Sequence, residues 1–160
     1  MPNALKDPTH IKIQEYLDSL DMGIKIIEFK VDTSTSELAA KALGVEVARI
    51  AKSLLILADN KPVLVVTSGD MRIDQKKLKS VLGARKIKFA DAETVLQLTN
   101  YPVGGVCPIG LGEDIKILLD TSMDRFPCVY AAAGTPHSAL PVTIPQLQTI
   151  AGGEVVDVCK

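Results

Sequence analysis

The loop at residues 101–112, YPVGGVCPIGLG, holds four glycines and two prolines among apolar residues. Glycine lets a substrate approach the backbone closely, and consecutive glycines such as Gly104 and Gly105 can aim N–H groups at an anion or a developing oxyanion. The loop matches neither the GxGxxG pattern nor the P-loop, so nucleotide binding by those routes is unsupported. A tight structural turn is the alternative interpretation of this glycine pair.

A second candidate is Lys52, which stands directly before the apolar run SLLILA at residues 53–58. An ammonium group at this place could enter a cavity and act as a point charge for a phosphate or an ester carbonyl. The alternative is a lysine at the end of a strand whose long side chain reaches water.

The segment AAGTPHS at residues 132–138 brings a glycine, two hydroxyls and an imidazole close together. His137 could act as a general base, although the chain lacks the GxSxG motif of a hydrolase nucleophile. A polar turn at the end of a strand is at least as good an interpretation. Cys107, inside the glycine loop, could react as a thiolate, but its apolar neighbours favour a packed, protonated thiol.

Charge is distributed unevenly along the chain. Residues 72–88 contain seven basic side chains and one acid, a local charge of +6, which leaves −7 for the rest of a chain whose net charge is −1. Such a segment could contact phosphates, while a solvated helix face is the alternative. Six aromatic residues in all argue against a platform that stacks many bases. The candidate phosphate contacts are Arg72, Lys76, Lys77 and Lys79.

Composition sets the broad class of the protein. With 160 residues, 47% of them hydrophobic, the chain suits one domain over 1–160 with a sizeable core. Its three cysteines form no CxxC pair and its two histidines are far apart, so we expect reduced thiols, no metal site and no cofactor. The N-terminal segment lacks the apolar core of a secretion signal, and no run approaches the ~18 apolar residues of a membrane span. These features predict a cytoplasmic protein.

Elements of secondary structure must position the candidate residues. Apolar stripes predict helices near 13–20, 34–43, 74–82, 91–98 and 143–151. Capping-box patterns begin at Ser34 and Thr143, and Asp74 and Asp91 are expected to cap the helices that follow them. Short apolar or β-branched runs predict strands near 24–29, 53–58, 63–66, 85–90, 115–119, 128–132 and 155–156, the second and third joined as a hairpin. Hairpin-like neighbours mixed with isolated helices indicate an α/β domain with a mixed, strongly curved sheet flanked by helices.

Four stretches in order resemble the YbaK/ProX family, the aminoacyl-tRNA-synthetase-associated domain that bacterial prolyl-tRNA synthetases also carry as an inserted editing domain. They are SELAAKALGVEVARIAKSLLIL, PVLVVTSGD, YPVGGVCPIG and LLDTSMDRFPCVYAAAGTPHSAL. The similarity runs over about 33–160. It implies a curved, barrel-like mixed sheet and trans-editing, the hydrolysis of the ester that joins a wrong amino acid to its tRNA.

The resemblance also implies roles for particular residues. Lys52 matches the family's lysine, which helps hold the 3′-terminal adenosine or the aminoacyl ester. Gly104 and Gly105 match the loop whose backbone positions the ester and a water. The pocket-lining turn corresponds to Gly134, His137 and Ser138, and the opposite wall to Thr33, Ser34 and Thr35.

The leading hypothesis is therefore an aminoacyl-tRNA deacylase for a small amino acid such as alanine, serine or cysteine. An activated ester needs positioning and oxyanion stabilisation, with no catalytic triad, metal or cofactor. A second sieve is useful because small side chains differ by only ~1–3 kcal/mol in binding. The expected partners are aminoacyl-tRNA and a synthetase, with no DNA and no membrane. The alternatives are a non-catalytic adaptor that binds a tRNA end or a nucleotide, and a thiol enzyme that uses Cys107.

Overall fold

The computed structural model describes residues 5–160, in which short helices and strands alternate. The α-helices are α1 (Pro8–Ser19), α2 (Ser36–Leu43), α3 (Gln75–Leu82), α4 (Ala92–Thr99) and α5 (Ile144–Ala151), with 3₁₀ turns at Val47–Arg49 and Thr121–Arg125. The strands are β1 (Ile27–Glu28), β2 (Ala51–Ala58), β3 (Lys61–Ser68), β4 (Ile87–Phe89), β5 (Lys116–Asp120), β6 (Val129–Ala131), β7 (Ser138–Val142) and β8 (Glu154–Val156).

Two expectations concern the ends of the chain and the membrane. Residues 1–4, which begin the segment in which we expect no secretion signal, lie outside the described residues. Within 5–160, none of the helices combines the length and the apolar character that a bilayer span requires.

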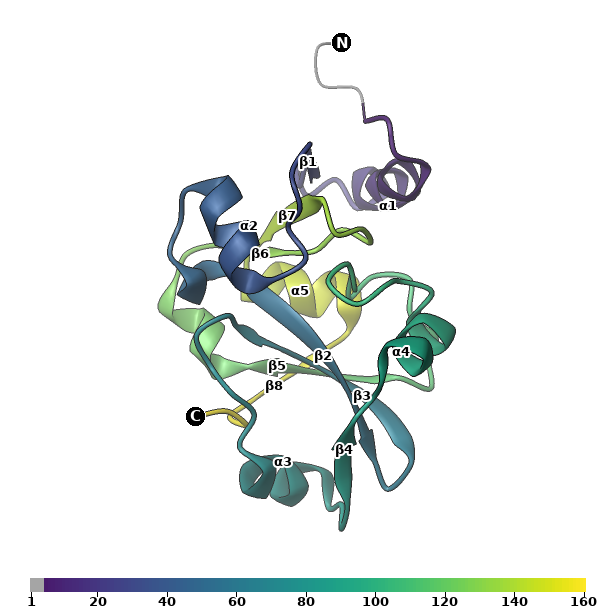
Figure 1. The fold of residues 1–160 in the computed structure, drawn as a ribbon, viewed down its shortest axis with the longest axis vertical. Coiled ribbons are helices and arrows are strands. Elements are labelled where there is room, and N and C mark those ends of the chain that lie inside the picture. Colours follow the sequence, from purple (N-terminus) through teal and green to yellow (C-terminus); the bar gives the residue numbers. More distant parts are fainter. Residues whose placement is uncertain (1–4) are drawn as a thin grey trace.

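The strands form two sheets rather than one (Figure 1). The larger sheet has the order β4-β2-β3-β5-β8 and is mixed, because β3, β5 and β8 run parallel while β2 pairs antiparallel with β3 and β4. The smaller sheet has the order β1-β7-β6 and is antiparallel. An isolated bridge between Ile50 and Tyr130 links them. The mixed sheet flanked by helices is confirmed, but the barrel-like sheet is not, since this single bridge does not close the strands into a barrel.

The hairpin of β2 and β3 is the longest pairing in the fold, and its two strands match residue for residue from Ala51–Ser68 to Ala58–Lys61. Asp59 and Asn60 form the connection with φ of 48° and 65°. This left-handed pair is the two-residue turn that suits the twist of a hairpin. The turn therefore fixes which residues of β2 face each side of the sheet.

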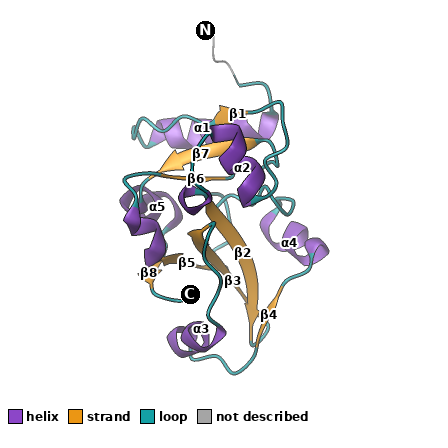
Figure 2. Ribbon diagram, turned by 60° about the vertical axis from the view of Figure 1, so that its left-hand side comes forward, coloured by secondary structure: helices purple, strands orange, loops and turns teal. Residues whose placement is uncertain are grey.

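Side chains of β2 alternate between two hydrophobic clusters. Leu55 belongs to the larger one, which lies between the two sheets and receives α1, α4 and α5. Ile56 belongs to the smaller one, which α3 covers through Leu78. Figure 2 shows α2 beside the small sheet and α3 at the opposite end of the molecule.

Helix starts follow local hydrogen bonding. Asp74 and Asp91 cap α3 and α4 as predicted, and Thr143 forms the predicted capping box at α5. At α2 the cap is Thr35, whose hydroxyl accepts from the Leu38 N–H at 3.1 Å, so the predicted box beginning at Ser34 is wrong by one residue.

Strand predictions differ from the structure in three places, one of them the strand predicted over residues 85–90, which shortens to Ile87–Phe89. The strand predicted over residues 24–29 shortens to Ile27–Glu28. Strand β7 has no counterpart among the predicted strands, and it contains a proline, a residue that is typical of a strand's end or edge. In the structure β7 nevertheless lies between β1 and β6, with Pro141 opposite Tyr130.

Candidate functional site

A cavity of about 240 Å³ lies between the start of β2, the start of α2, the glycine loop and the small sheet. Its walls are mostly aliphatic, with hydroxyl groups and one lysine among them. Because four consecutive residues of β2, 51–54, line it, the cavity meets this strand along its edge rather than on one face. The lining also includes Thr33–Ser36, Ala39, Leu43, Ile50, Val103, Gly104, Val106, Tyr130–Ala132, Ser138 and Ala139.

Lys52 is half-buried in this wall. Its ammonium does not extend into bulk water but donates to the backbone carbonyls of Gly69, at 3.4 Å, and Met71. Both acceptors belong to the loop that follows β3. The long side chain is therefore held in place, with its charge beside the cavity.

The loop after β3 is itself fixed at two points. The Asp70 carboxylate accepts two hydrogen bonds from the Arg125 guanidinium, at 2.7 and 3.1 Å. This pairing holds the pKa of Asp70 below its ordinary value against the opposing effect of partial burial. Gly69 approaches α2 so closely that a Cβ there would lie 3.0 Å from the Ser36 Cβ. One of the two carbonyls that accept from Lys52 therefore belongs to a residue packed against the first turn of α2.

The two glycines of the loop differ in what they offer. Gly104 lines the cavity with φ of +86°, and a Cβ on it would lie 2.7 Å from the Ser34 carbonyl oxygen. Within residues 5–160 its N–H has no backbone acceptor. Gly105 is buried, and its N–H already donates to the Pro102 carbonyl at 2.9 Å. Only Gly104 therefore has an amide free for a ligand.

The turn that precedes β7 has its polar groups paired. The Ser138 hydroxyl accepts from the Ala133 N–H and donates to the Thr135 carbonyl, each at 2.9 Å. The Thr33 hydroxyl accepts from the Ser138 N–H at 3.0 Å, and the Thr33 N–H donates to Pro136 at 2.7 Å. Thr33 and Ser138 reach the cavity wall, but these bonds occupy their hydroxyls.

Behind the turn lies His10, which is fully buried. Its Nδ1 is 2.7 Å from a Glu28 carboxylate oxygen and its Nε2 is 2.7 Å from the Thr135 hydroxyl. Burial would raise the pKa of Glu28, but hydrogen bonds from Asp7 and Lys6 N–H and from His10 lower it to about 2. This cluster joins α1 and β1 to the turn.

Two further residues of the predicted site lie outside the cavity. Gly134 sits under α1, where a Cβ would lie 2.6 Å from the Thr9 methyl group. His137 is half-exposed, with Nε2 3.2 Å from the Asp7 carboxylate. It lines a second, more open hollow that adjoins the cavity through Ser34 and Val103. The other residues of this hollow are Phe29, Lys30, Val31, Asp32 and Pro136.

The structure disfavours a reactive thiol at Cys107 and a metal ion at the cluster of Asp7, His10 and His137. Cys107 is fully buried, and burial raises the pKa of its thiol to about 12, so the thiolate is scarce near neutral pH. Asp7, His10 and His137 bring ligand atoms within 4.8 Å of one another. Since Glu28 and Thr135 engage both ring nitrogens of His10, a metal would have to displace a short protein hydrogen bond.

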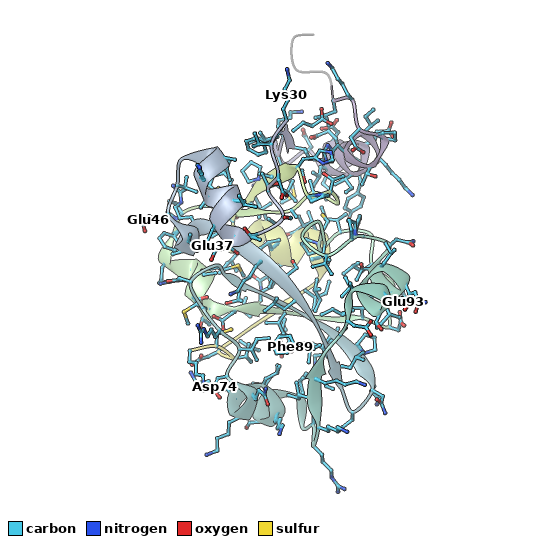
Figure 3. All side chains as sticks on the ribbon, viewed as in Figure 1. Lys30, Glu37, Glu46, Asp74, Phe89 and Glu93 are labelled. Atoms are coloured by element: carbon cyan, nitrogen blue, oxygen red, sulfur yellow. The ribbon has the colours of Figure 1, made fainter. Side chains whose placement is uncertain are left out.

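The basic segment lies away from the cavity, because α3 is at the other end of the large sheet from α2. In Figure 3, Asp74 marks the start of α3 and Glu37 the first turn of α2. Lys77 pairs with Asp157 at 3.1 Å, whereas Lys76 is exposed on α3. Phosphate binding by Arg72, Lys76, Lys77 and Lys79 stays a prediction. Contacts of the three lysines on α3 would be remote from the cavity, whereas Arg72 directly follows Met71, whose carbonyl accepts from Lys52.

Six residues of the predicted site line the cavity and three do not. The lining residues are Lys52, Thr33, Ser34, Thr35, Gly104 and Ser138, and those outside it are Gly105, Gly134 and His137. Sequence reasoning missed Ser53 and Gly69. The signal for Ser53 was a hydroxyl next to Lys52 in an apolar strand. The signal for Gly69 was a glycine directly after β3.

Comparisons with known proteins give a match to one family model and to several relatives. Residues 30–150 match the family model described as "Aminoacyl-tRNA editing domain". The chain is 38% identical over 137 residues to YwhH of Bacillus subtilis (strain 168), covering 84% of this chain and 87% of YwhH. It is 39% identical over 95 residues, 59% of this chain, to a proline–tRNA ligase of Endomicrobium trichonymphae, but that match spans only 16% of the ligase.

Solved structures resemble the whole fold. A crystal structure described as a candidate trans-editing enzyme for prolyl tRNA synthetase superposes with a TM-score of 0.87 at 31% identity, covering 98% of this chain and 99% of the other. The structure of the protein APE2540 superposes with a TM-score of 0.86 at 29% identity, covering 93% and 99%.

Proposed function

This chain belongs to the aminoacyl-tRNA editing domain family, and we propose that it hydrolyses the ester between tRNA and a wrongly attached small amino acid. The observation that carries the proposal is the cavity in which Lys52, the start of α2 and the free amide of Gly104 meet. All three present positive charge or N–H groups. Negative charge that develops on an ester oxygen would be stabilised there.

The reaction needs little else from the protein. Water adds to the ester carbonyl carbon, the bond from that carbon to the ribose oxygen breaks, and the ribose oxygen takes up a proton. The neighbouring ribose hydroxyl can assist because it is part of the substrate. The role of the protein is to hold the ester against Gly104 and Lys52, which lowers the barrier by positioning and charge.

The size of the cavity supports a small aminoacyl group. About 240 Å³ is below the range of about 300–1,000 Å³ that is usual for drug-sized ligands. Aliphatic walls such as Ala39, Leu43 and Val106 leave room for an alanyl, seryl or cysteinyl side chain.

The adenosine that carries the amino acid would then lie in the adjoining hollow. Val31 and Val103 are more than half exposed there and offer apolar surface to a base. Lys30 and His137 line the same hollow and could meet the ribose or a phosphate. In this proposal, His137 binds the substrate outside the cavity itself.

The proposed partners follow from the substrate. Aminoacyl-tRNA is the direct ligand, and the similarity to a segment of proline–tRNA ligases supports association with such a synthetase. A protein that removes wrong amino acids from tRNA would be found in the cytoplasm, where tRNA is charged.

The test is a panel of tRNAs charged with alanine, serine, cysteine, proline and leucine, in which ester loss is followed with and without the protein. We expect faster loss for one or more of the three small residues and the spontaneous rate for leucine. If every ester in the panel survives at its spontaneous rate, the deacylase proposal is wrong. Tight binding of charged tRNA without turnover would then favour the non-catalytic adaptor.

A further inference from the structure

The edge of β2 that faces the cavity carries backbone groups without a partner strand. Neighbouring β4 pairs only with Ile56–Ala58, and the Ala90 N–H donates to the Leu55 carbonyl at 3.0 Å on the same edge. Since backbone groups alternate in direction along a strand, those of Ala51 and Ser53 also point to this side. The bridge between Ile50 and Tyr130 brings β6 alongside the strand at Ala51, so the unpartnered stretch is at Ser53, between this bridge and β4. The carbonyl of Ile50 points the other way and accepts from Gly69 at 2.7 Å.

The Ser53 side chain adds a second unpartnered group at the same place. Its hydroxyl oxygen is buried and has no hydrogen-bond partner in the part of the chain that the structure describes. Ser53 shares its face of the strand with Ala51 and Leu55, which belong to the core cluster between the sheets. A buried polar group that stays unpaired is costly, so a ligand or water is expected to meet it.

The cavity therefore has hydrogen-bond donors and positive charge on one side and hydrogen-bond acceptors on the other. Lys52, the first turn of α2 and the Gly104 amide present positive groups, whereas the β2 edge presents carbonyl oxygens and a hydroxyl. An aminoacyl ester has the matching division, because its ammonium group is one carbon away from the ester carbonyl. A cation next to backbone carbonyls gains charge-assisted hydrogen bonds.

We propose that the open edge of β2 at Ser53 binds the free α-ammonium group of the substrate amino acid, with the Ser53 carbonyl and hydroxyl accepting its hydrogen bonds. This inference rests on the proposed function and narrows its substrate class. The protein acts on esters whose amino group is free and rejects those whose amino group is acylated, because an amide nitrogen carries no charge and brings added bulk.

The first experiment varies the substrate. Alanyl-tRNA, propionyl-tRNA and N-acetylalanyl-tRNA are compared, each as the rate enhancement over its own spontaneous hydrolysis. Propionyl lacks the amino group without adding bulk. We expect the enhancement to fall about tenfold or more for both modified esters. Equal enhancement for alanyl and propionyl esters would overturn the inference and leave the deacylase proposal intact.

A binding measurement separates the two proposals if no ester is cleaved. Alanyl and propionyl groups linked by an amide to 3′-aminoadenosine cannot be hydrolysed by ester chemistry, and their affinities can be measured by calorimetry. Tighter binding of the alanyl compound, by about tenfold, supports ammonium recognition even in a protein without turnover. Equal affinities contradict it.

The second experiment varies the protein. We expect Ser53→Ala to raise the KM for alanyl-tRNA about three- to tenfold with little change in kcat, since the hydroxyl binds ground state and transition state alike. The same variant should leave the kinetics with propionyl-tRNA unchanged, which a purely structural role would not do. Ser80→Ala, an exposed serine on α3, is the matched control. An equal loss with both substrates would contradict the proposal.

Discussion

Two walls of the cavity treat their polar groups in opposite ways. In the turn before β7, the hydroxyls of Thr33, Thr135 and Ser138 are all engaged by hydrogen bonds within the protein. Along the edge of β2, the hydroxyl and backbone of Ser53 have no partner within residues 5–160. The wall whose polar groups are all hydrogen-bonded keeps its shape without a ligand. The wall whose polar groups have no partner can use them to bind a ligand.

This contrast separates scaffold from binding surface in a site whose residues look alike in the sequence. Serines and threonines occur on both walls, so residue type does not distinguish them. The hydrogen-bond partners of each hydroxyl distinguish the two walls. A hydroxyl with two hydrogen bonds inside the protein gains little from a substrate, whereas a buried hydroxyl with none gains a hydrogen bond. Variants on the open wall should therefore change activity, and variants behind the closed wall should change stability.

The largest effect is expected for Lys52→Ala. Removing a cation beside the developing oxyanion should slow deacylation about 100-fold or more. The free energy of unfolding should fall by only about 1–2 kcal/mol, because two backbone carbonyls lose the half-buried ammonium as their donor. Single-turnover ester loss and urea unfolding measure the two quantities. Lys61→Ala, an exposed lysine at the far end of the hairpin, is the matched control. A fully active Lys52→Ala protein would remove this residue from the site.

The closed wall is tested by His10→Ala. Loss of the imidazole removes two hydrogen bonds of 2.7 Å and leaves a cavity behind the turn, so we expect the unfolding free energy to fall by about 2–3 kcal/mol. Deacylation per folded molecule should change by less than about threefold. His137→Ala, whose side chain is half-exposed, should cost less than about 1 kcal/mol of stability. If His10→Ala left stability unchanged but abolished turnover, the division between the walls would be wrong.

Acid should weaken the same wall. Because the pKa of Glu28 is about 2 in the folded protein against 4.5 ordinarily, the unfolded chain binds the proton first as pH falls. Stability from this group is complete well above pH 4.5 and is lost on going down toward pH 2, an effect of about 3 kcal/mol in all, of which about 2 kcal/mol is lost by pH 3. Urea unfolding at pH 7 and pH 3 measures it. Glu28→Gln should be less stable at pH 7 and should show a shallower acid dependence than the wild-type protein.

The smallest effect is expected at the far end of the molecule. Lys76→Ala combined with Lys79→Ala should weaken binding of tRNA about two- to threefold at low salt, and the difference should shrink as salt is added. A short aminoacyl-adenosine ester, which cannot reach α3, should be hydrolysed at the wild-type rate. Weakened hydrolysis of that short ester would place α3 in contact with the cavity after all.

Much of the fold was predictable because its signals are local. Asp74 and Asp91 stand next to the helices that they cap, and the turn at Asp59 and Asn60 lies between the strands that it joins. The separation into two sheets was not, since it depends on which distant strands pair. Nothing near Ser138 or Pro141 in the sequence reveals that β7 lies between β1 and β6.

The site was predictable in part for the same reason. Lys52 and Gly104 were singled out from residue type and from family resemblance, and both line one cavity. That Gly105 has its amide occupied by Pro102 follows from the tight turn between them, which the letters GG do not specify. The availability of Ser53 depends on where β4 stops, a property of another segment altogether.

The close approaches of the glycines tie together segments that are far apart in the chain. A Cβ on Gly104 would collide with Ser34, one on Gly105 with Thr135 and one on Gly134 with Thr9. The two members of each pair are therefore coupled in evolution. A side chain at the glycine position is tolerated only when the backbone or side chain of the partner residue moves away. Among relatives of this protein, substitutions at the two members of each pair should accordingly appear together rather than alone.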